Sequence, residues 1–189
     1  AVDTFSVNRW QQYAQVVAGI RRWVEPLPEP LKSNLLHDNA ARLFDSDANS
    51  FNLNAFQLRV SRASTASDPV GFTAKLHAGR DAQKIHSGGM GSASQDFDLP
   101  EAYLSYTPPS APKLTLTGGK FVTHEGLEVI ETPLNPNFSP GLLFAYAEPF
   151  THTGLKATYA AHEKVSATLG LANGWDTTQD ANEGKTLLW

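Results

Sequence analysis

The sequence predicts an all-β protein, and two features favour an antiparallel transmembrane β-barrel with about eight strands present. The first feature is a repeated alternation of apolar and polar residues, which is typical of strands with two different faces. The second is that short and long connections take turns along the chain. In an antiparallel sheet this order places every short turn at one end and every long loop at the other, as in outer-membrane barrels.

The clearest alternation lies between residues 113 and 172. Its first run carries apolar or small residues on one parity (Leu114, Leu116, Gly118, Val122) and polar or small ones on the other (Lys113, Thr115, Thr117, Gly119). The next two runs repeat the pattern, with Leu155, Ala157 and Tyr159, and then Val165, Ala167, Leu169 and Leu171, on the apolar parity. These runs predict three strands, the last two joined by a short turn at 161–164.

Further runs predict the remaining strands. They span residues 52–62, 72–79, 99–107 and 185–189, and the first of them changes its apolar parity as a bulge or a rim aromatic would require. Residues 3–17 also fit a strand, although the spacing from Trp10 to Arg22 satisfies a helical period equally well. Prolines and other turn residues predict long loops at 24–50 and 123–152, within a single domain that covers residues 1–189.

Composition excludes some partners and leaves the compartment open. The net charge is -4, the isoelectric point is about 5.8 and basic residues form no stripe, so nucleic acid is not expected as a partner. The chain contains no cysteine, which excludes disulfides and thiolate metal sites. A mean hydropathy of -0.31 does not argue against a membrane barrel, because only alternate residues of its strands face lipid.

The two faces of the predicted strands allow two architectures. A barrel would direct the polar face into a water-filled lumen, whereas a soluble β-sandwich would expose that face to solvent. Aromatic residues near the strand ends favour the barrel, because they would form its interfacial girdles; these are Tyr106, Phe121, Tyr159 and Trp175.

Several motifs in one order resemble the OmpL-like β-barrel porins of bacterial outer membranes. They are Gly118-Gly-Lys-Phe-Val-Thr123, Gly126-Leu-Glu-Val-Ile-Glu131, Asn137-Phe-Ser139, Pro149-Phe-Thr-His-Thr-Gly-Leu155 and Asn173-Gly-Trp175. The resemblance extends less sharply back to about Leu43, while residues 9–36 match the family pattern poorly. Such porins are generally longer and the last expected strand is very short, which favours a fragment of a larger barrel over a small closed barrel.

The resemblance implies a channel in the bacterial outer membrane that lets small hydrophilic solutes and ions diffuse passively. Its expected partners are outer-membrane lipid, these solutes, and further copies or other membrane proteins in a complex. Two alternatives remain, namely a soluble or surface-attached β-sandwich that binds a ligand through its long loops, and a plugged structural barrel that anchors partners. No cofactor is expected.

Ionisable residues on the polar parity are the candidates for lining a pore, because charged rings set selectivity and would be costly toward lipid. They are Arg59, Lys75, His77, Glu101 and Lys156; on a soluble sheet the same residues would be ordinary solvated side chains. The segment 142–147 is expected to form a short helix that begins at Pro140. If the loop folds inward, Leu142, Phe144 and Tyr146 would supply a constriction. The alternative is an extracellular loop that packs on its neighbours.

No catalytic or metal-binding constellation is evident. The six histidines lack ligand spacing, and the adjacent pairs His124-Glu125 and His162-Glu163 would point to opposite faces of a strand. Asp45, Asp47 and Asn49 alternate like calcium ligands, but Ser50 and Phe56 stand where the turn glycine and bidentate glutamate would be. The chain is therefore not expected to be an enzyme or to hold a metal.

Overall fold

The computed structural model describes residues 25–26, 51–135, 140–180 and 184–189, which fall into two compact units. The sheet unit comprises residues 51–124 and 149–189, and the loop unit includes residues 125–148. The predicted strand at 3–17, nearly all of the 24–50 loop and the Asp45–Asn49 cluster lie outside the described residues.

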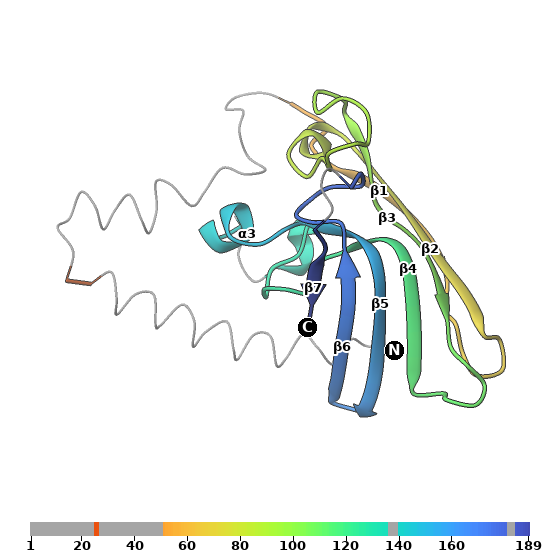
Figure 1. Cartoon of the computed structure of the whole chain (residues 1–189). Helices are drawn as coiled ribbons and strands as arrows, with labels where there is room; N and C mark the ends of the chain where they lie inside the picture. The colour runs from red at the N-terminus through yellow and green to blue at the C-terminus, as the bar shows by residue number, and fades with distance from the viewer. Residues whose placement is uncertain (1–24, 27–50, 136–139, 181–183) are drawn as a thin grey trace. The chain divides into compact units, whose positions relative to one another are not determined.

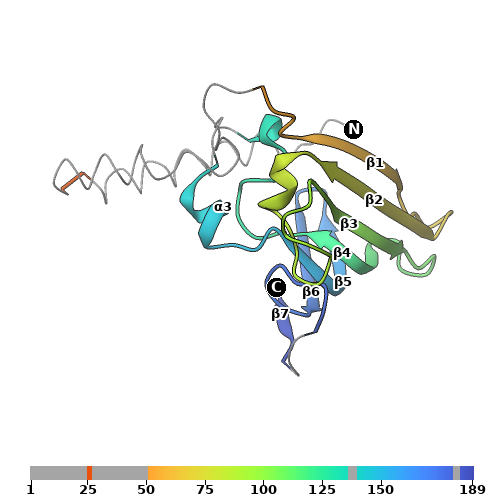
Figure 2. The same cartoon turned by 90° about the horizontal axis from the view of Figure 1, so that it is seen from above.

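The sheet unit contains one antiparallel sheet in which every strand pairs with the next one in the sequence (Figures 1 and 2). Its strands are β1 (Phe56–Arg62), β2 (Val70–Ala78), β3 (Phe97–Tyr106), β4 (Leu114–Val122), β5 (Thr151–His162), β6 (Val165–Ala172) and β7 (Thr186–Leu188). The all-β, antiparallel prediction is confirmed, and seven of its strands are described. β1 and β7 form the two edges and do not pair with each other among the described residues.

The short and long connections alternate as predicted. The short ones are 63–69, 107–113 and 163–164, and the long ones are 79–96, 123–150 and 173–185. The first long loop begins with the 3-10 helix η2 (Arg80–Gln83), and the second contains η3 (Thr132–Leu134) and the predicted short helix, α3 (Leu142–Tyr146). No helix in the described residues is long and apolar enough to cross a membrane.

The structure corrects the first predicted strand. β1 begins at Phe56 rather than Asn52, and its register with β2 runs unbroken from Phe56 opposite Ala78 to Arg62 opposite Phe72. The change in apolar parity is thus the end of the strand and not a bulge. The irregularity lies in the next pair, where Lys75 pairs with Glu101 but His77 pairs with Asp98. Pro100 lies in the shifted segment and cannot donate a ladder hydrogen bond.

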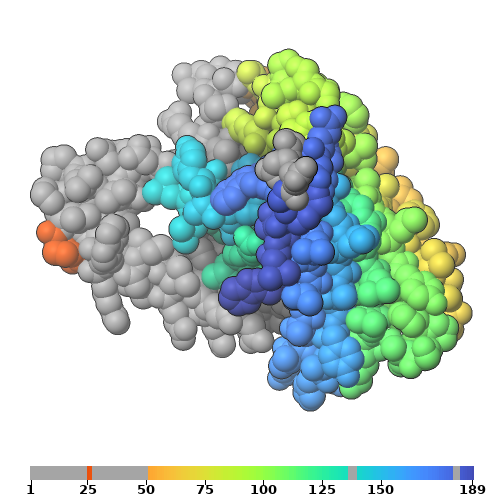
Figure 3. Space-filling model, in the orientation of Figure 1, coloured from red at the N-terminus to blue at the C-terminus, as the bar shows by residue number. Residues whose placement is uncertain are grey.

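In a soluble protein the apolar face of a sheet is normally buried, but here the polar face is buried and the apolar face is exposed. On β2, the polar parity is buried, with Thr73 at 5% and Lys75 at 6% exposure, whereas Phe72 on the other parity is 39% exposed. The same inversion runs across the sheet, where aliphatic residues are more than 40% exposed on each of the other strands: Leu58, Val60, Leu104, Leu116, Leu155, Leu169, Leu171 and Leu187. In the view of Figure 3, β5 and β6 lie side by side on the surface.

A small apolar cluster lies on the polar side of the sheet. It consists of Phe121, Ala172 and Leu188, with Tyr103 packed against them. Phe121 is only 2% exposed, so its predicted place in an outer aromatic girdle is wrong. The other three predicted girdle residues, Tyr106, Tyr159 and Trp175, are exposed.

Candidate functional site

The centre of the polar face is a charged row of three residues on adjacent strands, Arg59, Lys75 and Glu101. Arg59 of β1 pairs with Lys75 of β2, which pairs with Glu101 of β3, and directly paired residues share a face of the sheet. The Lys75 Nζ lies 3.0 Å from Glu101 Oε2, and the Arg59 Nε lies 3.9 Å from the same oxygen. One carboxylate therefore balances two cations.

The other two predicted pore residues lie on the same face. Lys156 of β5 places its Nζ 4.2 Å from the centroid of the Phe121 ring and interacts electrostatically with Glu101. His77 is 2% exposed and shares a 2.9 Å hydrogen bond between its Nδ1 and the Gln57 Nε2. The structure thus brings all five predicted residues to one face, and their role in lining a pore stays a prediction.

Hydroxyl groups form a second row on the polar face, nearer the short turns. Ser64 Oγ lies 2.8 Å from Thr107 Oγ1, which lies 3.2 Å from Thr115 Oγ1. Thr115 pairs with Thr158 across the β4–β5 ladder, and Thr158 Oγ1 lies 3.0 Å from Thr168 Oγ1. The side chains of this hydroxyl row form hydrogen bonds but carry no charge. The polar face therefore has neutral side chains near the short turns and charged side chains closer to the long loops.

A buried ion pair lies at the long-loop end of the sheet, and sequence reasoning missed it. Lys120 is 5% exposed, its Nζ lies 3.3 Å from both carboxylate oxygens of Asp98, and Met90 Sδ is 3.2 Å away. The sequence does contain one indication that Lys120 needs an ionic partner. Lys120 shares the parity of Leu116 and Gly118, where a lysine facing lipid would be costly and needs a partner.

Asp176 ties the third long loop to the start of β5. Its Oδ1 accepts hydrogen bonds from the backbone N–H groups of Phe150 at 2.9 Å and Thr151 at 2.8 Å, and from Thr151 Oγ1 at 3.4 Å. Burial raises the pKa of Asp176, and these hydrogen bonds partly offset that effect. Ser87 Oγ, from the first long loop, lies 2.8 Å from Thr151 Oγ1, so both loops are fixed at the same residue.

The loop unit holds its own buried carboxylates. Glu128 accepts hydrogen bonds from the Gly141 N–H at 3.0 and 2.9 Å, and burial raises its pKa despite these bonds. Burial, with the nearby charges of Glu128 and Glu125, raises the pKa of Glu148 to about 7.

In the first long loop of the sheet unit, burial raises the pKa of Asp81 to about 6, and Lys84 partly offsets this.

The three predicted constriction residues belong to α3 in the loop unit. Phe144 is buried, Leu142 is partly buried and Tyr146 is 77% exposed. Of the three, Tyr146 therefore presents the largest accessible surface, and their role in narrowing a pore stays a prediction.

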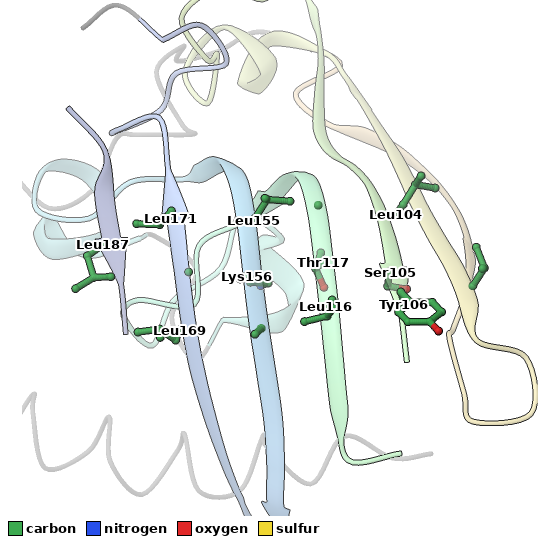
Figure 4. Close-up of a pocket in the computed structure, with 14 residues that line it drawn as sticks. Leu104, Ser105, Tyr106, Leu116, Thr117, Leu155, Lys156, Leu169, Leu171 and Leu187 are labelled. Atoms are coloured by element: carbon green, nitrogen blue, oxygen red, sulfur yellow. The ribbon is translucent and has the colours of Figure 1, made fainter. Parts of the chain in front are cut away.

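The exposed face carries an open apolar hollow of about 680 Å³ (Figure 4). Its walls are side chains from strands β2 to β7, including Leu104, Tyr106, Leu116, Leu155, Leu169, Leu171 and Leu187. An apolar hollow with few polar groups suits hydrocarbon better than a polar ligand.

The described residues contain no group of three or more histidine and acidic side chains placed to hold a metal ion. The polar face carries charged groups, hydroxyl groups and an imidazole, which can form ionic contacts and hydrogen bonds.

The fold and this distribution of side chains define an antiparallel β-sheet protein of inverted polarity, with charged groups buried on one face and aliphatic groups exposed on the other. The chain belongs to the family described as "Putative beta-barrel porin-2, OmpL-like", whose profile matches residues 31–189. This confirms the resemblance found in its motifs. Comparison with curated proteins and with solved structures found no match.

Proposed function

We propose that this chain forms the wall of a porin-type channel in the bacterial outer membrane, through which small hydrophilic solutes and ions diffuse passively. In this proposal the sheet closes into a barrel with strands or chain beyond the described residues. The exposed apolar face contacts lipid, and the face with the charged and hydroxyl rows lines the lumen. The protein performs no catalysis, and its partners are lipid, solutes and further copies or other membrane proteins.

The observation that carries the proposal is the inverted burial of the sheet. Fully covering one exposed Leu or Phe side chain is worth about 1.5–3 kcal/mol, and this face exposes such residues on all seven described strands. In water that surface would drive aggregation, whereas in a bilayer it is covered by acyl chains. A lysine turned toward the bilayer midplane would cost about 2–4 kcal/mol, which explains why Lys75 and Lys156 lie on the other face.

The two alternatives fit these observations less well. A β-sandwich packs the apolar faces of two sheets together, but the described strands form one sheet whose apolar face is exposed. A plugged structural barrel would share the same wall, so only transport distinguishes it from an open channel.

Reconstitution of the full-length chain in planar lipid bilayers tests the proposal. We expect stepwise conductance, a detergent requirement during extraction from membranes, and a mobility on gels that changes on heating as the barrel unfolds. Monodisperse protein in plain buffer would contradict the membrane assignment. Heat-modifiable protein that never conducts would contradict the open channel and support the plugged barrel.

A further inference from the structure

We propose that the lumen wall formed by this sheet selects for small anions over cations, through Arg59 of the charged row and through Lys156 on the same face. The inference rests on the proposed channel function and adds the class of solute.

The first support is the charge carried by the strands themselves. On the polar face, the seven described strands carry four cationic residues (Arg59, Lys75, Lys120, Lys156) and two carboxylates (Asp98, Glu101), a difference of two positive charges. Arg62 is left out because it pairs with Phe72 on the apolar face and forms an ion pair with Asp68. The whole chain has 15 basic and 19 acidic residues, a net charge of -4. The polar face of the described strands therefore has the opposite sign from the chain as a whole.

The second support is which of these charges solvent can reach. The Arg59 side chain is 53% exposed, whereas the Glu101 side chain beside it is only 6% exposed. Asp98 is fully buried in its ion pair with Lys120. Both carboxylates of the strands are thus covered, and a solute that moves along this face meets the guanidinium first.

The third support is the position of Lys156. This residue is partly exposed, and the Phe121 ring lies 4.2 Å from its Nζ, a contact that holds the ammonium group in place without neutralising it. Arg59 lies 3.9 Å from the Glu101 carboxylate, and Lys156 of β5 interacts electrostatically with the same carboxylate. Charged groups of one sign in a confined, low-dielectric wall attract counter-ions and set the sign of selectivity.

The reversal potential of the reconstituted full-length chain under a potassium chloride gradient measures this selectivity. The salt concentration is held near 0.1 M, where the Debye length of about 10 Å leaves the wall charges effective. We expect a chloride-to-potassium permeability ratio above one. Arg59→Gln and Lys156→Gln each lower that ratio by about twofold, and Glu101→Gln raises it.

Lys113→Gln is the matched control, because Lys113 is an exposed lysine in the β3–β4 turn, away from the charged row. It leaves the ratio unchanged, and heat-modifiable mobility on gels shows that each variant is folded. The inference is overturned if the channel conducts but prefers potassium. It is also overturned if neither Arg59→Gln nor Lys156→Gln changes the permeability ratio. In both cases the channel function stands. A folded protein that never conducts overturns the channel function and the inference with it.

Discussion

Lys75 and Glu101 form a buried ion pair, 3.0 Å from Nζ to Oε2, at directly opposed positions of β2 and β3. Their side chains are 7% and 6% exposed. Removing Lys75 leaves the buried Glu101 carboxylate with Arg59, which is 3.9 Å away and 53% exposed, while replacing both partners of the pair is far less costly.

Lys75→Met is therefore expected to lower the free energy of unfolding by about 3 kcal/mol. The double variant Lys75→Met/Glu101→Leu recovers most of that loss, because neither charge of this pair remains. Urea titration of the protein folded into lipid vesicles measures both, with Lys113→Met as the exposed control. Equal stability of Lys75→Met and Lys113→Met would show that the pair does not stabilise the sheet.

Adjacent glycines in β4 provide a matched test of the backbone. Gly119 has a φ of 130°, and a Cβ there would meet the backbone of Tyr103, 2.8 Å from its Cα. A Cβ at Gly118 would meet only the Leu155 Cδ2 atom, at 2.8 Å, and that flexible side chain can move.

We expect Gly119→Ala to lower the free energy of unfolding by about 1–3 kcal/mol, since the alanine is forced into a strained conformation against backbone. Gly118→Ala should cost clearly less. The same titration in vesicles compares the two variants. If Gly118→Ala were the more damaging, the conformation described at Gly119 would be wrong.

Asp176 anchors the third long loop to β5, and the anchor depends on an acceptor oxygen rather than on charge alone. Asp176→Ala leaves the Phe150 and Thr151 N–H groups without this acceptor, at a cost of about 2 kcal/mol. Asp176→Asn keeps an acceptor and tolerates the φ of 43°, so it should retain most of the stability. Amide hydrogen exchange at Phe150 and Thr151 reports the difference, and equal exchange in the two variants would argue against the anchor.

Glu148 makes the stability of the loop unit depend on pH. Its pKa is raised from 4.5 to about 7, mainly by burial. The folded loop therefore binds its proton more tightly than the unfolded loop does. The resulting stabilisation is fully present below pH 4.5 and is lost as the pH rises through about 7.

Hydrogen exchange of residues 125–148, corrected for intrinsic rates, should show stronger protection near pH 5 than near pH 8. Glu148→Gln removes most of this difference, whereas Glu163→Gln, at an exposed turn, leaves it intact. A pH dependence that persists in Glu148→Gln would assign it to another group.

The sequence predicts correctly which residues of β5 and β6 share a face. Successive side chains of a strand point to opposite faces, so neighbours such as Leu155 and Lys156 must lie on different sides of the sheet. The sequence predicts less about β4. The φ of Gly119 and the partner of Lys120 depend on contacts with β3 and the loops, so alternation alone does not show that Lys120 and Phe121 are buried.

The candidate site was predictable as a set of residues but not as an arrangement. The parity of Arg59, Lys75 and Glu101 places each on the polar face, yet their alignment in one row requires the registers of two strand pairs. The pairing of His77 with Asp98 depends on the irregularity at Pro100, which alternation alone does not reveal. The Asp176 anchor joins segments more than twenty residues apart, beyond any local pattern.

In the proposed barrel, the exposed apolar face of the sheet contacts lipid and the polar face contacts water. Because the chain has no cysteine, single cysteines at positions 155 to 159 of β5 can each carry a spin label without background. In vesicles, we predict that labels at 155, 157 and 159 collide mainly with lipid-soluble oxygen, and that labels at 156 and 158 collide mainly with a water-soluble nickel chelate. Equal access of the nickel chelate to all five positions, or the reverse alternation, would contradict the account.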